Sequence, residues 1–358
     1  MRVGAYNPYL HTRGGGERYF LDGCLALAKR HEVTVLVPEG PRTHDELTAQ
    51  LTALLGTDLS PLRFVPLGPG EAPQRALNRF DATFSVTNDR PLMGVPHPHV
   101  AVLQFPFGIT RWRLRRRLRA AIAMARCDRL LVYSNYVRRW ANTIPGARPL
   151  VVAPGVTPVP ANRRPKEPII LAVGRFTASG HNKKHGALID AFSDVVKSLP
   201  DWRLAMVGAL GDGDRDYLDS LRERAAGIQV QFFPNAERGE LELLYRRASL
   251  FWHGAGLGVD AQRNPELMEH FGIVAVEAMS AGAVPLVFNG GGLPEIVVDG
   301  ECGLLWSTPD ELVRLTVELA KDDATRQAMA GRARERARLF SAETFVKGFE
   351  DVLPDAMR

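Results

Sequence analysis

The stretch Ile169-Ile170-Leu171-Ala172-Val173-Gly174-Arg175 decides the fold of this chain of 358 residues. Its apolar, partly β-branched start predicts a buried strand, and the glycine after it predicts a turn. Helical periodicity then runs through Leu188, Ile189 and Phe192. Because the same alternation of short strand and longer helix fills nearly the whole sequence, we predict an α/β fold with parallel sheets covered by helices.

A proline-rich stretch separates two sets of strand candidates. Pro154 to Pro168 contains five prolines, which break helical and strand periodicity, and we interpret it as an interdomain linker. The candidates before it are 2–6, 32–37, 63–67, 81–86, 100–104, 129–133 and 150–153, and those after it are 169–173, 203–207, 228–233, 249–252, 284–288 and 303–306. The sequence thus predicts two Rossmann-like, doubly wound domains, 1–160 and 161–340, facing each other across a cleft.

The segment 341–358 predicts a final helix with one apolar face. Ser341 is a suitable N-cap, and the apolar side chains that follow recur at helical spacing, at Phe345, Phe349, Val352 and Leu353. A helix with a single apolar face needs a surface to cover it.

Composition excludes several classes of protein. Apolar residues make up 45% and charged residues 24% of the chain, which excludes a disordered, collagen-like or coiled-coil protein. The net charge of +5 favours anionic partners, whether nucleic acid, nucleotide phosphates or an anionic membrane. The three cysteines, Cys24, Cys127 and Cys302, are isolated and form no readable disulfide framework or metal site. With neither a signal-peptide pattern nor a long apolar run, we expect a cytoplasmic protein.

Three glycines open the first predicted helix. Gly14-Gly15-Gly16-Glu17 follows the strand 2–6, where a glycine lets the backbone approach a ligand and a helix N-terminus offers amides to an anion. A flexible turn is an equally good interpretation of the glycines alone.

Basic side chains follow the strand 169–173. Arg175 comes directly after it with Gly174, and Gly180-His181-Asn182-Lys183-Lys184 opens the next helix. A guanidinium and an ammonium from two loops at one sheet edge can hold a diphosphate and neutralise a leaving group. The alternative, a solvated basic loop, is preferred for Lys184 but not for Arg175.

Two carboxylates lie eight positions apart in Glu269-His270-Phe271-Gly272-Ile273-Val274-Ala275-Val276-Glu277. We expect a helix to begin near Gly272, with Glu269 before it and Glu277 on it. Carboxylates accept hydrogen bonds from the hydroxyls of a sugar ring, while the amides of a helix N-terminus face phosphate. An acidic first turn that favours the helix dipole is a sufficient alternative for Glu269, but not for Glu277, which looks buried.

These residues resemble those of the family-4 glycosyltransferases, which have the two-domain GT-B fold. The resemblance lies in the early Gly-Gly-Glu, Gly174-Arg175, Lys183 nine residues before Phe192, the spacing of Glu269 and Glu277, Glu277-Ala278-Met279-Ser280-Ala281-Gly282, Pro285, Gly291-Gly292-Leu293-Pro294-Glu295-Ile296-Val297, and Gly300 to Leu305. It is strong over about residues 168–306, and it is weak in the first half of the chain apart from its start. The sequence around Trp252-His253, Met268-Glu269-His270 and Gly180 to Lys184 is similar to that of a mannosyltransferase-like branch. His253 is either a structural residue or part of the donor site.

The resemblance implies a role for each matching residue. Arg175 and Lys183 would hold the donor diphosphate with Gly174, Glu269 would contact the donor sugar, and Glu277 the ribose hydroxyls. Residues 270–273, His270, Phe271, Gly272 and Ile273, would line the donor site, and Gly15 and Gly16 would approach the reaction centre from the other domain. The final helix would cross back to the first domain.

The resemblance also implies a retaining transfer without a metal or other cofactor. The co-substrate would be a nucleotide diphosphate sugar, GDP- or UDP-linked, and the acceptor a hydroxyl on a glycan, lipid-linked or small molecule. The acceptor would attack on the face that the diphosphate leaves, and a phosphate oxygen would take its proton. Many family members have a histidine where this chain has Gln104, which can orient a hydroxyl but cannot act as a base.

An arginine-rich stretch leaves three interpretations open. Arg111, Arg113, Arg115, Arg116, Arg117 and Arg119 form a solvated helix face, a site for peripheral contact with an anionic membrane, or a clamp for an acceptor phosphate that includes Arg111. No nucleic acid is expected, because Trp112 is the stretch's single aromatic residue. The rival to the enzyme is a basic two-domain protein that binds nucleic acid or anionic membrane without turnover; Glu269 and Glu277 favour the enzyme.

Overall fold

The chain divides into two compact units. The structure is a computed structural model that describes all residues except 11–14, 39–43, 161–164, 180–181 and 212, so the predictions for Gly14, Gly180 and His181 lie outside the described residues. The first unit comprises residues 1–155 and 342–358, and the second comprises 156–341.

Part of the proline-rich stretch, which we interpreted as an interdomain linker, packs on the second unit. Val156 and Val159 are buried in the second unit, where the Val156 amide donates to the Phe340 carbonyl at 2.8 Å and the Val159 amide to Ser280 Oγ at 3.0 Å. Pro168 is the second residue of the strand Glu167–Val173. Proline is tolerated this close to the start of a strand.

The first unit contains a parallel sheet of seven strands in the order β3-β2-β1-β4-β5-β6-β7. The strands are β1 Arg2–Tyr6, β2 Glu32–Val37, β3 Arg63–Pro66, β4 Ala82–Thr87, β5 His99–Leu103, β6 Arg129–Val132 and β7 Pro149–Val151. The central strands are apolar because both faces of the sheet are covered. The helices are α1 Gly15–Ala28, α2 His44–Leu55, α3 Pro73–Leu77, η1 Ile109–Arg111, α4 Leu114–Ala125, α5 Asn135–Ala141, α13 Ala342–Val352 and η3 Asp355–Met357.

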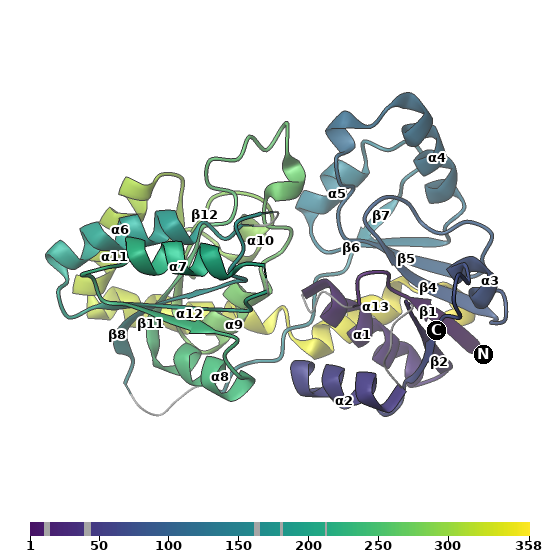
Figure 1. The fold of residues 1–358 in the computed structure, drawn as a ribbon, viewed down its shortest axis with the longest axis horizontal. Helices are drawn as coiled ribbons and strands as arrows, with labels where there is room; N and C mark the ends of the chain where they lie inside the picture. Colours follow the sequence, from purple (N-terminus) through teal and green to yellow (C-terminus); the bar gives the residue numbers. More distant parts are fainter. Residues whose placement is uncertain (11–14, 39–43, 161–164, 180–181, 212) are drawn as a thin grey trace. The chain divides into compact units, whose positions relative to one another are not determined.

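The final helix α13 packs on the first unit, as predicted (Figure 1). Phe349 contacts Phe84 of β4 edge to face at a centroid distance of 5.6 Å, and Phe345 contacts Tyr19 of α1 at 5.1 Å. Both phenylalanines are buried. The lone apolar face therefore becomes part of the core of the N-terminal sheet, although the helix is separated from it in sequence by the whole second unit.

The second unit contains a parallel sheet of six strands in the order β10-β9-β8-β11-β12-β13. The strands are β8 Glu167–Val173, β9 Arg203–Gly208, β10 Val230–Pro234, β11 Ala248–His253, β12 Val284–Phe288 and β13 Leu304–Trp306. The helices are α6 His185–Ser198, α7 Arg215–Arg224, α8 Arg238–Arg247, η2 Pro265–Leu267, α9 Ile273–Ser280, α10 Leu293–Ile296, α11 Pro309–Lys321 and α12 Asp323–Arg338. All strand candidates in both halves are present.

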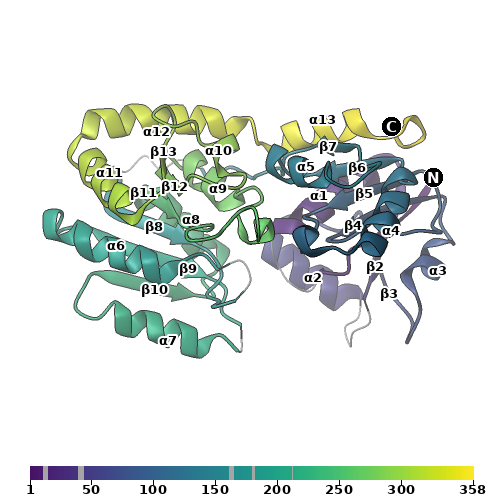
Figure 2. The same ribbon diagram turned by 90° about the horizontal axis from the view of Figure 1, so that it is seen from above.

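The order of each sheet reverses at its centre. In the second unit the chain moves outward from β8 to β9 and β10, then returns beside β8 as β11 and continues to β12. Because parallel crossovers are right-handed, this reversal puts α6 and α9 on opposite faces of the sheet (Figure 2). The loops after β8 and β11 therefore diverge at the carboxyl edge, which is where such sheets bind ligands. The predicted pair of doubly wound α/β units is confirmed.

No helix among the described residues has the length and apolar character that a membrane crossing requires.

Candidate functional site

Three polar side chains meet at the carboxyl edge of the second sheet. His253 is the last residue of β11, Lys183 lies in the loop between β8 and α6, and Glu269 precedes α9. Lys183 Nζ donates to Glu269 Oε2 at 2.6 Å, and His253 Nε2 lies 3.1 Å from the same oxygen. Two of the predicted site residues, 86 positions apart, are thus in direct contact.

The environment of this cluster keeps Glu269 ionised. Burial by itself would raise the pKa of the Glu269 carboxyl, but the Lys183 ammonium and the hydrogen bond from His253 outweigh it and hold that pKa well below its usual range. The pKa of His253 is lowered because the ring is buried. At neutral pH Glu269 is therefore a carboxylate and His253 a neutral imidazole.

The hydrogen bonds of His253 define its tautomer. The Ala255 amide donates to His253 Nδ1 at 3.4 Å, so the ring hydrogen is on Nε2, which faces Glu269. The sequence left His253 undecided between a structural and a donor-site role. Here it lies against the Glu269 carboxylate, and its place at the end of the strand beside the switch point was the signal for that position.

Glycines bring the backbone of the β8 loop close to this cluster. A Cβ at Gly174 would lie 2.4 Å from Lys183 Cγ, so only glycine lets the lysine stem pass. Arg175, the next residue, is exposed, and its guanidinium has no hydrogen bond or ion pair within the described parts of the chain. The second predicted cation therefore starts beside Lys183 and is available to a ligand.

Asn182 and His185 hold the Lys183 loop in place. Asn182 Nδ2 donates to the Thr177 carbonyl at 2.7 Å, and its Oδ1 accepts from the Lys184 amide at 2.6 Å. His185 is buried beside Phe176, and burial lowers its pKa to about 4, so it remains neutral. The sequence analysis did not assign either residue a role, because a loop anchor has no pattern of its own.

Gly208, at the end of β9, packs closely against the backbone at the start of the same loop. A Cβ there would lie 1.9 Å from the Gly174 carbonyl oxygen, a backbone atom that cannot rotate away. We expect Gly208→Ala to lower the free energy of unfolding by about 1–3 kcal/mol through overpacking and to shift the loop that begins at Gly174. Urea unfolding measures the first effect.

Gly239 provides a matched control for that substitution. It lies on α8, and a Cβ there would contact nothing within 4 Å. Gly239→Ala should therefore stabilise the protein slightly, by about 0.5–1 kcal/mol from helix propensity. Equal unfolding midpoints for the two variants would contradict the close approach of Gly208 to Gly174.

Glu277 is buried on α9 and already has two partners. Its Oε1 accepts from Arg238 at 2.7 Å and its Oε2 from the Tyr245 hydroxyl at 2.9 Å, both from α8. The prediction that Glu277 is buried is confirmed. Its charge is compensated by Arg238, a residue that sequence reasoning missed because the ion pair joins two helices.

The segment before α9 has a tightly packed backbone. Gly272 precedes the helix at φ 113°, a conformation suited to glycine, and the Gly292 amide donates to the Glu269 carbonyl at 2.8 Å. The amides of Ile273 and Val274 belong to the first turn, whose N–H groups have no helical acceptor. Phe271 is buried against Phe340, and His270 Nε2 lies 3.2 Å from the Glu266 carbonyl. Backbone amides, more than the side chains of 270–273, are therefore suited to an anion here.

The first unit brings two of its predicted residues together. A Cβ at Gly16 of α1 would lie 2.2 Å from Gln104 Nε2 and 3.2 Å from the Tyr133 hydroxyl. Gly16 therefore makes room for a polar pair at the carboxyl edge of the first sheet. Gly15 is the exposed first residue of α1, and Arg111 is the exposed last residue of η1.

No group of three or more histidine, cysteine, aspartate or glutamate side chains is placed to hold a metal ion in the ranges that the structure describes.

Two family models match the chain. One, described as "Glycosyl transferases group 1", matches residues 158–336, which is half of the 358 residues, and one described as "Glycosyltransferase Family 4" matches residues 13–159. The chain belongs to the group 1 glycosyltransferases. The first match contains Arg175, Lys183, Glu269 and Glu277, so the resemblance predicted from these motifs is confirmed at the level of the family.

Curated relatives of this group 1 glycosyltransferase match about half of it. It is 28% identical over 198 residues to a D-inositol 3-phosphate glycosyltransferase of Corynebacterium kroppenstedtii, across 53% of this chain and 41% of that protein. It is 29% identical over 197 residues to a GDP-Man:Man(3)GlcNAc(2)-PP-Dol alpha-1,2-mannosyltransferase of Neurospora crassa, across 52% and 34%. The chain therefore spans less than half the length of these relatives.

The fold of this group 1 glycosyltransferase is similar to that of solved structures along the whole chain. Its TM-score is 0.74 with HepE of Anabaena, crystallised in complex with UDP and glucose, at 18% identity and with 98% of both chains covered. It is 0.68 with WaaG, a glycosyltransferase involved in lipopolysaccharide biosynthesis, at 18% identity, covering 99% of this chain and 100% of WaaG. The predicted GT-B fold class is confirmed.

Proposed function

We propose that this group 1 glycosyltransferase moves a sugar from a nucleotide diphosphate sugar to a hydroxyl acceptor with retention of configuration. The observation that carries the proposal is the contact of Lys183 Nζ with the Glu269 carboxylate at the switch point of the second sheet, whose β8 loop also contains the exposed Arg175. Fixed positive charge suits a diphosphate, and an adjacent carboxylate suits sugar hydroxyls.

The donor would be a UDP- or GDP-linked hexose. HepE of Anabaena was crystallised with UDP and glucose, which supports a UDP-linked donor. The relative in Neurospora crassa is named for GDP-mannose, which supports a GDP-linked donor and the transfer of mannose. Arg175 and Lys183 would bind the diphosphate, Glu269 the sugar, and Glu277 the ribose hydroxyls. Because Glu277 accepts hydrogen bonds from Arg238 and Tyr245, ribose would share this carboxylate with those two side chains.

In the proposed reaction the bond from the sugar's anomeric carbon to the diphosphate oxygen breaks, and a bond to the acceptor oxygen forms on the same face. The acceptor proton passes to the departing phosphate. Negative charge grows on the diphosphate as it leaves, and Arg175, Lys183 and the first amides of α9 would stabilise it. Gln104 would orient the acceptor hydroxyl without taking its proton.

The basic pair would also do the work that a divalent cation does in other transferases, so we propose that no metal or other cofactor is needed. Lys183 pairs with Glu269 in this structure. Donor binding would then exchange part of that ion pair for contacts of the ammonium with phosphate and of the carboxylate with sugar hydroxyls.

A thermal-shift panel of nucleoside diphosphates and their sugars tests the donor class. A ligand at a hundred times its dissociation constant adds about 2.7 kcal/mol of stability, so one base should raise the melting temperature clearly above the others. The stabilising donor is then incubated with chelator present, and its hydrolysis or transfer is followed by NMR, which reports the anomeric configuration. Steep salt-dependent binding of nucleic acid with no turnover of any nucleotide sugar would contradict the proposal.

A further inference from the structure

Helix α4 of the first unit turns its large apolar side chains toward solvent. Leu114, Leu118 and Ile122 are 72%, 54% and 48% exposed. The side chains on the opposite, buried face are Ala120, Ala123 and Met124. A surface helix of a soluble domain normally has the reverse arrangement, with its large apolar residues inward.

The exposed apolar side chains form one continuous stripe. Leu114, Leu118 and Ile122 are at positions i, i+4 and i+8, which lie above one another on a helix. Arg115 and Arg119 follow each of the first two by one position and so form a parallel row beside the stripe. Both arginines are exposed, and neither has a side-chain partner in the described ranges of the chain.

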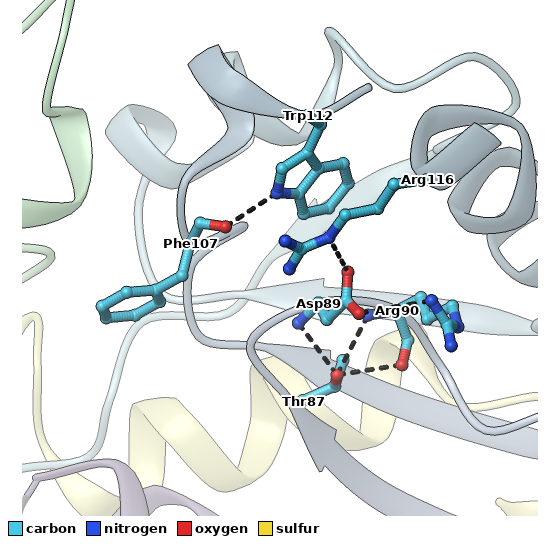
Figure 3. Close-up of polar contacts among 6 residues, drawn as sticks. All are labelled: Thr87, Asp89, Arg90, Phe107, Trp112 and Arg116. Atoms are coloured by element: carbon cyan, nitrogen blue, oxygen red, sulfur yellow. Dashed lines mark hydrogen bonds and ion pairs between the residues drawn. The ribbon is translucent and has the colours of Figure 1, made fainter. Parts of the chain in front are cut away.

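Two other arginines fix the orientation of the helix. Arg116 Nε donates to Asp89 Oδ1 at 3.1 Å, and its guanidinium lies 4.5 Å from the centre of the Trp112 ring (Figure 3). Trp112 Nε1 in turn donates to the Phe107 carbonyl at 2.8 Å, and Arg117 donates to the Ile109 carbonyl at 3.2 Å. These contacts hold the inner side of α4 on the loops after β4 and β5, so the stripe points outward.

The chain segment that contains the stripe has charges of one sign. Between Asp89 and Asp128 the sequence contains no aspartate or glutamate. It contains eight arginines there, which are Arg90, Arg111, Arg113, Arg115, Arg116, Arg117, Arg119 and Arg126. A surface that joins exposed leucines to the guanidinium groups of Arg115 and Arg119 complements a partner that is apolar inside and anionic at its edge.

We propose that the outer face of α4, defined by Leu114, Arg115, Leu118, Arg119 and Ile122, docks the protein on an anionic lipid bilayer. The three aliphatic side chains enter the boundary between headgroups and acyl chains, and the two arginines bind lipid phosphates. A clamp for an acceptor phosphate does not need the leucine stripe. Single-stranded nucleic acid would need stacking surfaces, whereas Trp112 is buried beneath Arg116. The docking goes beyond the proposed reaction and does not depend on it.

Co-sedimentation with vesicles tests the proposal. The full chain is mixed with vesicles of phosphatidylcholine alone and with vesicles of phosphatidylcholine and phosphatidylglycerol in equal parts. We expect binding to the second kind only, weakened by salt. Each basic side chain near an anionic surface strengthens binding about fivefold, so Arg115→Gln with Arg119→Gln should weaken the partition coefficient about 25-fold.

The leucine stripe is tested by a triple variant, Leu114→Ser, Leu118→Ser and Ile122→Ser. It should lower binding to anionic vesicles at least about tenfold, because its apolar insertion is lost. Leu243→Ser with Leu339→Ser, two exposed leucines of the second unit, and Arg215→Gln with Arg222→Gln on α7 are the matched controls and should bind like the wild type. Since all the substituted side chains are exposed, melting temperatures should be unchanged.

Three results would overturn the proposal. The first is a wild-type chain that binds neither kind of vesicle. The second is binding that the α4 variants and the controls weaken equally. The third is a wild-type dimer in solution that the triple variant converts to a monomer, which would assign the stripe to a second copy of the chain. Turnover of a water-soluble acceptor, measured on the same variants, should be unaffected, so failure here is distinct from failure of the proposed reaction.

Discussion

Arg175→Ala is expected to lower kcat about a hundredfold or more while leaving donor affinity nearly unchanged. Its guanidinium is exposed and has no partner in the described residues, so the side chain contributes little to the folded state. Arg175 follows Gly174, which comes directly after β8 and packs against the Lys183 stem, and this position is suited to a charge that grows only as the diphosphate leaves. Removing one group that stabilises such charge costs about 3–4 kcal/mol of activation free energy.

Steady-state kinetics and donor binding by calorimetry separate the two quantities. Arg215→Ala, an exposed arginine on α7 of the same unit, is the control and should behave like the wild type. Arg175→Lys should recover part of kcat, because it restores the charge without the two-pronged geometry. Equal losses of turnover and donor affinity would show that Arg175 binds the ground state, and the transition-state role would have to be abandoned.

The ion pair of Lys183 and Glu269 should show strong coupling in a double-mutant cycle. Only 20% of the Lys183 side chain and 14% of the Glu269 side chain are exposed. Lys183→Met and Glu269→Gln should each lower the free energy of unfolding by about 2–4 kcal/mol, because each leaves a largely buried charge without its partner. The double variant should be destabilised by less than the sum of the two, with a coupling energy of about 1–3 kcal/mol.

Turnover separates a structural ion pair from a functional one. If the two side chains bind the donor, the double variant should regain stability and remain at least about a hundredfold less active than the wild type. Double-variant activity close to that of the wild type would contradict a role in the reaction. Additive unfolding energies would contradict the contact itself.

The same pair predicts a pH dependence of stability. The pKa of Glu269 lies below its usual value of 4.5, so the folded state prefers the carboxylate. Its contribution is complete above about pH 4.5 and is lost as the pH falls through the lowered pKa. Urea unfolding as a function of pH should therefore show the wild type and Glu269→Gln converging in acid. A gap that stays constant down to the acid limit would contradict the shift.

Much of the fold could be predicted from periodicity. Strands such as 2–6, 32–37 and 284–288 were predicted with the bounds that the structure has, because a buried parallel strand is a short apolar run with clear ends. The linker was less predictable, since prolines mark a break in regular structure but do not show that Val156 and Val159 are buried. Membership of the family followed from motifs that are local in sequence.

The site was predictable only in part. The sequence identified Lys183 and Glu269 by residue type and spacing, but a spacing along the chain does not say which atoms touch. Arg238, Asn182 and Gly208 act through contacts made by other strands and helices, and no local pattern marks them. Glu277 looked ready for a ligand, whereas its two oxygens already accept hydrogen bonds from α8.

The sequence by itself determined the two α/β units and the family, and it identified the charged residues that we propose hold a diphosphate sugar. Periodicity and motifs depend on residues within about 20 positions of one another, so they can be recognised in the sequence without the structure. Only the tertiary structure decided that one oxygen of Glu269 faces both Lys183 and His253, that Gly208 supports the Gly174 loop, and that α4 faces outward with its leucines. These depend on strand order and on which helix face meets the sheet, which packing settles between segments far apart in sequence.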